Sequence, residues 1–202
     1  LVALESVRRI TDIETLVELM RERAASPLSY NSLKEDLQTD DKTVKRWMLL
    51  LENSYVFFKV PPYSKSLKLT IKKSPKYYFF DVPRVIDAGP RFENLVALAL
   101  YKEILFRNDT LGEEYSLHYL RDKLHKEVDF LICKEKKPIA MIETKLSDEN
   151  PSNHFEHFSK QSGLQSVHKI QVVLNLRKPF STKNGIQVVK ASDWLPHLTG
   201  AF

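Results

Sequence analysis

Apolar residues recur at helical spacing through the first fifty positions of the chain. One apolar face predicts a helix over 11–24, and it is made by Ile10, Ile13, Leu16, Leu19 and Met20. A second short helix holds Leu33 and Leu37, with Ser29 or Asn31 as its N-cap. Thr39 and Asp40 offer a cap for a third helix, and its expected buried stripe is Val44, Trp47, Met48 and Leu51.

The pattern then changes to strand spacing. Residues 55–60 form a β-rich run, Leu67, Leu69 and Ile71 alternate with polar residues, and 76–81 predicts another short strand. Three helices followed by a hairpin is the order of a winged helix-turn-helix. In that fold the third helix enters the DNA major groove and the hairpin touches the backbone.

Basic residues lie on both parts of this predicted DNA-binding surface, the third helix and the hairpin. The expected nucleic-acid contacts are Lys42, Lys45 and Arg46 on the third helix, with Lys68 and Lys72 on the hairpin. An equally weighted alternative is a winged helix that packs against protein, with its lysines simply solvated.

Residues 86–202 predict a second domain with the order α-β-β-β-α-β. The expected helices are 92–106 and 154–162, and the expected strands are 115–120, 128–135, 138–146, 170–176 and 186–190. The first helix is apolar almost all round, which predicts burial on every side. Pro83, Gly89 and Pro90 mark the break. The fold class is therefore α+β or α/β, with domains at 1–85 and 86–202.

The segment 127–145 carries the candidate chemistry. A hairpin centred on Lys136 places Asp129 opposite Glu143, and strand alternation puts Lys145 on the same face. Paired carboxylates suit Mg²⁺ or Mn²⁺, and Lys145 would stabilise developing negative charge. Glu93, on the buried helix, is a further candidate for this cluster. The alternative is a cross-strand ladder of ion pairs, with Glu93 as a charge at a helix start.

Three other polar residues are weaker candidates. His154 and His157 are spaced for a metal-binding helix face, although two surface histidines are the favoured interpretation. Gln161 is a possible downstream member of the site. Cys133 is expected to be a buried small hydrophobe.

The composition of the chain bears on its possible partners and on its cellular compartment. The chain has 31 basic and 26 acidic residues and a pI near 9.1, which permits nucleic-acid contact without requiring it. Cys133 stands alone, so no internal disulfide can form, and a cytoplasmic location is expected. No apolar run is long enough for a membrane span. The chain starts without methionine and has no phosphate-binding glycine loop, which predicts a fragment of a longer protein.

Several motifs together resemble a known family. Glu93, Asp129 and Glu143-Thr-Lys145 match the pattern of the PD-(D/E)XK nuclease superfamily. More narrowly, the chain resembles an uncharacterised domain family found C-terminal to the AAA-type ATPase core of bacterial and archaeal proteins; the matching segments are 51–63, 74–81, Phe92-Glu-Asn, Tyr119-Leu-Arg, Glu127-Val-Asp-Phe and Ile142-Glu-Thr-Lys. The resemblance implies an N-terminal core that holds the ATP, and metal and catalytic roles for Asp129, Glu143, Lys145 and Glu93.

Three functions remain in competition. The first is a Mg²⁺-dependent endonuclease acting on DNA, with the ATPase core as its partner. The second is a catalytically silent platform that docks DNA or protein for the ATPase. The third is a structural domain for assembly of the ATPase, and a homo-oligomer is open in each case.

Overall fold

A computed structural model describes residues 2–64, 74–147, 150–161 and 163–199, which divide into two compact units. The first unit runs to Val60 and continues over Ser74–Asn94. The second takes in 61–64 and the chain from Leu95 onward. Each unit has its own hydrophobic core.

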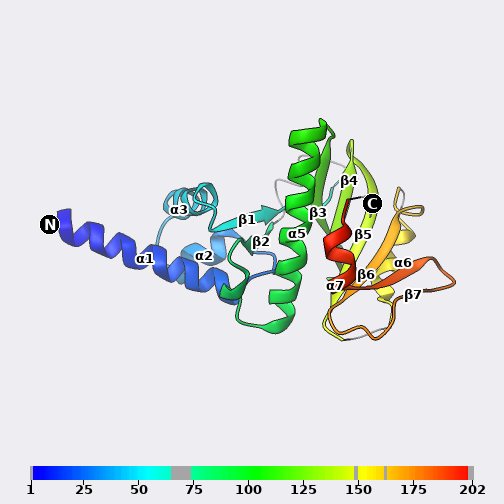
Figure 1. Cartoon of the computed structure of the whole chain (residues 1–202). Coiled ribbons are helices and arrows are strands. Elements are labelled where there is room, and N and C mark those ends of the chain that lie inside the picture. Colours follow the sequence, from blue (N-terminus) through cyan, green and yellow to red (C-terminus); the bar gives the residue numbers. More distant parts are fainter. Residues whose placement is uncertain (1, 65–73, 148–149, 162, 200–202) are drawn as a thin grey trace. The chain divides into compact units, whose positions relative to one another are not determined.

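The first unit contains three helices followed by two strands, in the order that the sequence predicts (Figure 1). They are α1 (Val2–Glu22), α2 (Tyr30–Asp36), α3 (Asp41–Asn53), β1 (Phe57–Val60) and β2 (Lys76–Phe79), and the 3-10 turn η1 (Val82–Arg84) comes after them. The two strands pair antiparallel, with Phe57 opposite Phe79. The predicted strand around Leu67, with Lys68 and Lys72, lies outside the described residues.

The local signals for α2 and α3 are confirmed. Ser29 caps α2, because its side chain accepts a hydrogen bond from the Ser32 amide. Asp40 caps α3 by accepting from the amides of Lys42 and Thr43. The buried residues of α3 are the four predicted: Val44, Trp47, Met48 and Leu51. They join a core with Leu16, Met20, Phe57 and Phe79.

The second unit is a mixed six-stranded sheet with helices. After α5 (Ala88–Leu111), which begins within the first unit, come β3 (Tyr115–Arg121), β4 (Glu127–Lys134), β5 (Lys137–Lys145), α6 (Asn153–Ser159), β6 (His168–Val173), β7 (Phe180–Ser181), β8 (Ile186–Lys190), α7 (Ala191–Trp194) and η2 (Leu195–His197). The strand order is β3-β4-β5-β6-β8-β7. Strands β3, β4 and β5 pair antiparallel, whereas β5, β6 and β8 run parallel.

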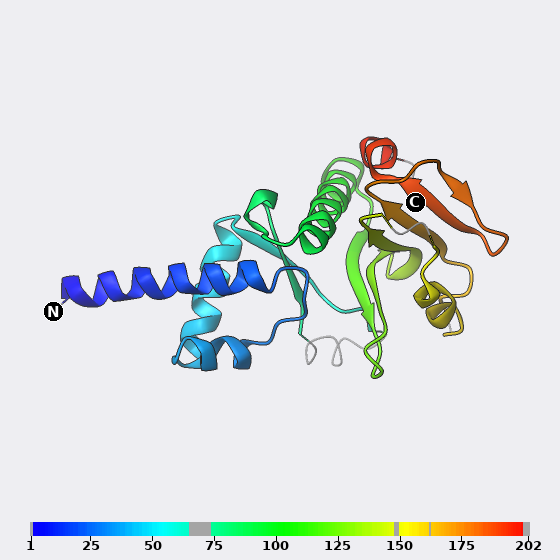
Figure 2. The ribbon, with the colours of Figure 1, turned by 90° about the horizontal axis from the view of Figure 1, so that it is seen from below.

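Helices cover both faces of this sheet (Figure 2). Phe155 and Phe158 of α6 pack in one cluster with Leu131, Met141 and Val173. Because side chains alternate along a strand, Phe130 and Ile142 point to the other face, which α5 covers. The prediction that α5 is buried on every side is wrong: Leu95, Leu105, Phe106 and Leu111 are exposed. The buried apolar residues of α5 in this unit are Val96, Ala97, Leu100 and Ile104, and Arg107 is buried beside them.

The β4–β5 hairpin has the predicted register at the end that lies away from its turn. Phe130 pairs with Ile142 and Ile132 with Ala140, as a centre at Lys136 requires. The register shifts by one after Ile132, and the strands join through a two-residue turn at Glu135 and Lys136. Both turn residues have positive φ, which the favoured two-residue hairpin turns need.

Within the described ranges, no helix combines the length and apolar character that a membrane crossing requires.

Candidate functional site

Asp129, Glu143 and Lys145 lie at one end of the β4–β5 hairpin. The last paired residues of the two strands are Phe130 and Ile142, so Asp129 and Glu143 are the next residues along. Strand alternation puts both carboxylates on the face of Leu131 and Met141, which α6 covers. Lys145 shares this face. The structure therefore brings Glu143 and Lys145 into contact and places the Asp129 carboxylate against Thr144, the residue between them.

Asp129 is hydrogen-bonded to Thr144, the middle residue of the Glu143-Thr-Lys145 motif. Its Oδ2 atom accepts a hydrogen bond from the Thr144 amide at 2.8 Å and another from the Thr144 hydroxyl at 2.7 Å. The carboxylate thus takes the place of a strand partner where the pairing of β4 with β5 ends. Both bonds from Thr144 go to the same oxygen, so Oδ1 keeps lone pairs for another ligand.

Glu143 is the buried acid of the site, with a side chain only 4% exposed. Its Oε1 atom lies 2.9 Å from Lys145 Nζ, 3.4 Å from the hydroxyl of Ser152 and 3.6 Å from His154 Nδ1. A buried carboxylate requires such neighbours, because an uncompensated charge in the interior is strongly unfavourable. Lys145 is 34% exposed, so the site opens to solvent on the lysine side.

Gln171 orders the residues that face Glu143. It is fully buried on β6 and pairs directly with Glu143 in the parallel ladder. Its side chain accepts from the Ser152 amide and donates to the Asn150 carbonyl, both at 2.9 Å. These two bonds fix the loop before α6, where Ser152 is the N-cap.

Sequence reasoning missed Gln171, although a signal was present. It is the polar residue in an apolar stretch, Ile170 to Val173, that was correctly assigned to a strand. A polar residue at a buried strand position needs partners and is therefore a candidate for a structural or functional role. Gln161, the residue predicted instead, is exposed just after α6.

Glu93 is held within the first unit. Its Oε1 atom accepts from Lys76 Nζ at 2.9 Å and from the Tyr78 hydroxyl at 2.7 Å. The next residue, Asn94, bonds both the amide and the carbonyl of Phe79. Glu93 lies beyond the first turn of α5, so the interpretation as a charge at the helix start is wrong. The carboxylate of Glu93 binds side chains of β2 in the first unit, whereas Asp129, Glu143 and Lys145 belong to the second unit.

The hairpin end offers carboxylate oxygens as possible cation ligands. Among the residues that the structure describes, no group of three or more His, Cys, Asp or Glu side chains is placed to hold a metal ion. Mg²⁺ commonly uses one or two carboxylates and completes its shell with water. Asp129 and Glu143 are two carboxylates at this end of the hairpin.

The remaining polar candidates, Cys133, His154 and His157, differ in what surrounds them. Cys133 is buried, as predicted, and burial raises the pKa of its thiol to about 12, so it is an inert thiol at neutral pH. His157 Nε2 lies 2.6 Å from Asp122 Oδ2, and its Nδ1 lies 3.4 Å from Lys126 Nζ. His154, unlike His157, has its Nδ1 atom directed at the candidate site.

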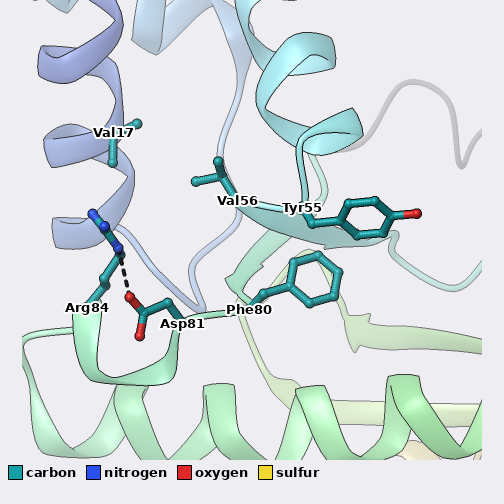
Figure 3. A pocket seen from close by; sticks show the side chains of 6 residues that line it. All are labelled: Val17, Tyr55, Val56, Phe80, Asp81 and Arg84. Atoms are coloured by element: carbon teal, nitrogen blue, oxygen red, sulfur yellow. Dashed lines mark hydrogen bonds and ion pairs between the residues drawn. The ribbon is translucent and has the colours of Figure 1, made fainter.

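The predicted DNA-contacting residues of α3 are accessible. Lys42, Lys45 and Arg46 are all exposed, on the side opposite the buried stripe. A separate hollow of about 500 Å³ in this unit is lined by Val17, Tyr55, Val56, Phe80, Asp81 and Arg84 (Figure 3). The Tyr55 and Phe80 rings meet edge to face at 5.6 Å, and Arg84 pairs with Asp81. None of the predicted site residues lines it.

Comparison with protein-family models assigns the two halves of the chain. Residues 1–83 match a domain of unknown function, DUF8612, and residues 88–194 match another, DUF4143. The second match covers more than half of the sequence, and the chain belongs to the DUF4143 family. This family is associated in general terms with ATPase-type proteins. Neither the curated proteins nor the solved structures gave a match.

Proposed function

We propose that the second unit is a metal-dependent nuclease module that hydrolyses phosphodiester bonds of DNA. The observation that carries this proposal is the Lys145–Glu143 pair next to Asp129, which bonds Thr144 between them, at the point where two strands separate. The element order from α5 to β6 supports it, because it is the α-β-β-β-α-β order of the PD-(D/E)XK superfamily that the sequence resembles.

The roles of the residues follow from their chemistry. Asp129 and Glu143 would hold a divalent cation, Mg²⁺ or Mn²⁺, which supplies an activated water and neutralises phosphate charge. Lys145 lies 2.9 Å from Glu143 and is partly exposed, so its ammonium group would orient the water or stabilise the charge that develops on the phosphate. Thr144 fixes the orientation of Asp129 through its amide and hydroxyl.

We propose that the first unit is a winged helix that binds the duplex. Its support is the order of three helices and two antiparallel strands, with Lys42, Lys45 and Arg46 exposed on the third helix. Phosphate contacts by such side chains give affinity that falls steeply with salt. The general association of the family with ATPases supports an N-terminal ATPase core as the partner, with ATP bound only there.

The test of nuclease function is nicking of supercoiled plasmid in Mg²⁺ or Mn²⁺. We expect the wild-type chain to nick DNA, and Asp129→Asn, Glu143→Gln and Lys145→Met to lose at least about a hundredfold in rate. Lys45→Ala with Arg46→Ala should weaken DNA binding and flatten its salt dependence, yet preserve nicking at saturating DNA. No nicking by the wild type in either metal would refute the proposal.

A second candidate is a catalytically silent platform that docks DNA or protein for the ATPase. The observation in its favour is that Oε1 of Glu143 already has a lysine, a hydroxyl and an imidazole as neighbours. Such an arrangement is also what a buried ion pair needs for stability. DNA binding with a steep salt slope, without cleavage or metal binding, would identify this function.

A further inference from the structure

The hollow of about 500 Å³ in the first unit combines apolar walls with one charged pair (Figure 3). Val17, Val56 and Phe80 supply apolar surface, and Tyr55 adds a second aromatic ring. Figure 3 shows the two rings on one side of the hollow and the pair of Arg84 with Asp81 on the other. The volume lies within the range of about 300–1,000 Å³ that small-ligand sites occupy.

Tyr55 stands at a backbone position that favours glycine. It follows Ser54, the C-cap of α3, and has a φ of 56°. Its amide donates to the Glu52 carbonyl, and the next amide, that of Val56, donates to the Leu51 carbonyl. These two bonds form the Schellman arrangement, in which glycine is usual at the position of Tyr55. A bulky residue is strained there, because its Cβ atom crowds the backbone at positive φ.

Burial does not explain why an aromatic residue stands at this position. Tyr55 is 74% exposed, and its ring meets Phe80 edge to face at 5.6 Å, so most of the side chain remains accessible. Strained residues cluster at ligand sites, where the side chain is needed for contact rather than for packing. The strained backbone and the exposed ring of Tyr55 therefore both point to a ligand in the hollow.

The charged pair keeps hydrogen-bonding groups for such a ligand. Arg84 Nε lies 3.0 Å from Asp81 Oδ2, and in the described part of the chain neither side chain makes a further hydrogen bond. Both side chains are at least half exposed. Arg84 Nη1 and Nη2 thus remain as donors, and Asp81 Oδ1 remains as an acceptor. Donors next to an acceptor complement the edge of a nucleobase, on which both kinds of group lie side by side.

We propose that this hollow binds a nucleobase, which lies against the rings of Tyr55 and Phe80 and directs its polar edge to Asp81 and Arg84. Proteins hold unpaired bases in this way, by contact with aromatic side chains and by hydrogen bonds to the base edge. The base can belong to a free nucleotide or to an unpaired position of a nucleic-acid strand, because both present the same chemistry.

The proposed base site is separate from the proposed duplex contacts of the first unit. Tyr55 follows the end of α3, whereas Lys42, Lys45 and Arg46 lie in the first half of that helix. The inference therefore goes beyond the proposed function and does not depend on it. The double variant Lys45→Ala with Arg46→Ala should leave nucleotide binding in the hollow unchanged.

A second helix end in the same unit provides a matched control for Tyr55. Tyr55→Gly removes the ring and keeps the backbone conformation, because glycine adopts positive φ readily. Gln38 follows the C-cap of α2, has a φ of 48° and donates to the Glu35 carbonyl in the same way, but it does not line the hollow. Gln38→Gly therefore makes the same backbone change away from the site. Neither glycine variant should lower the urea midpoint of unfolding.

The experiment measures binding of nucleoside 5′-monophosphates by saturation-transfer NMR, and of a short single-stranded deoxyoligonucleotide by fluorescence anisotropy. We expect Tyr55→Gly to weaken binding about fivefold or more, which is the loss of one stacked base. Arg84→Met should also weaken it, whereas Gln38→Gly and Tyr55→Phe should bind as the wild type does. Ribose 5-phosphate, which has no base, should not displace the monophosphates.

The outcomes separate the two sources of the base and the failure of the inference. Tyr55-dependent binding of monophosphates identifies a free nucleotide, and Tyr55-dependent binding of the oligonucleotide alone identifies a base of a strand. Unchanged binding by Tyr55→Gly, an equal loss in Gln38→Gly, or displacement by ribose 5-phosphate would overturn the inference. Absence of binding of every probe by the wild type would overturn it as well, and plasmid nicking is decided independently.

Discussion

A lysine–glutamate pair in the first unit and another in the second have the same nitrogen–oxygen distance but opposite settings. In the first unit, Lys76 is the more deeply buried partner at 1% exposure, and Glu93 is 15% exposed. In the second unit the acid, Glu143, is buried, and Lys145 is 34% exposed. Both pairs have a nitrogen–oxygen distance of 2.9 Å. Contact geometry alone therefore does not separate a structural pair from a candidate site.

The surroundings of the two pairs are what differ. Glu93 also accepts from the Tyr78 hydroxyl, so the Lys76 pair is closed by groups of its own strand. Glu143 is approached by a hydroxyl and an imidazole from another element, and its lysine reaches solvent. A closed pair stabilises a fold, whereas a partly open pair can exchange a partner for a ligand.

The largest expected effect is a loss of stability on breaking the Lys76–Glu93 pair. Lys76→Met should lower the free energy of unfolding by about 3–5 kcal/mol, because it leaves a largely buried carboxylate without its cation. Urea denaturation measures this loss. Lys145→Met is the control and should cost less, since Lys145 is partly solvated. Equal losses for the two variants would contradict the distinction between closed and open pairs.

The next effect is on Gln171. Gln171→Leu removes two hydrogen bonds to the backbone, one from the Ser152 amide and one to the Asn150 carbonyl. We expect a loss of about 1–3 kcal/mol by urea denaturation, together with weaker Mn²⁺ binding. Gln161→Leu, at an exposed position, is the control and should change stability by less than about 0.5 kcal/mol. Unchanged metal affinity in Gln171→Leu would show that the amide does not order the site.

A smaller effect is expected at Thr144. Thr144→Val keeps the amide that bonds Asp129 and removes only the hydroxyl, so the loss should be about 1 kcal/mol in thermal or urea unfolding. Thr15→Val is a comparison on the exposed face of α1, where its hydroxyl bonds a helix carbonyl. If Thr144→Val costs nothing, the side-chain bond does not hold Asp129 in place.

The smallest effect concerns acid stability in the second unit. Burial alone would raise the pKa of Asp122, but hydrogen bonds from the Lys126 amide, from His157 and from the Leu124 amide outweigh it, and the net pKa is lowered. A lowered pKa stabilises the folded state above the unfolded value of about 3.9, and this stabilisation is lost as the pH falls through the folded pKa. Asp122→Asn should flatten the acid limb of stability, measured by urea unfolding between about pH 5 and pH 2. An unchanged acid limb in this variant would be inconsistent with the assignment.

Local patterns predicted much of the fold. The stripe of α3, its Asp40 cap and the order α-β-β-β-α-β depend on spacing and on short-range hydrogen bonds, which the sequence displays directly. The predicted register holds at Phe130 and Ile142, because a register shift after Ile132 compensates for the two-residue turn at Glu135 and Lys136. The apolar pattern of α5 was misleading, because an apolar residue on a helix does not have to be buried.

The rest depends on contacts between distant residues. Glu93 matched the family pattern, but nothing in its local sequence shows that Lys76 and Tyr78 surround its carboxylate. His154 and His157 are equivalent in spacing and differ only in what lies beneath α6. One faces Glu143 of the preceding strand and the other faces Asp122, and the spacing of the two histidines shows neither neighbour. The nuclease and DNA-binding roles remain predictions.

The parallel pairing of Glu143 with Gln171 also bears on when the site can form during synthesis. Parallel neighbours need a crossover between them, and here α6 supplies it. Glu143 leaves the ribosome well before Gln171, so the loop that carries Ser152 and His154 has no buried amide to hold it at first. The first unit is complete once Asn94 has emerged, and its core can close early. Ribosome-bound chains that end shortly before β6 should therefore contain a protease-resistant first unit and an unassembled candidate site.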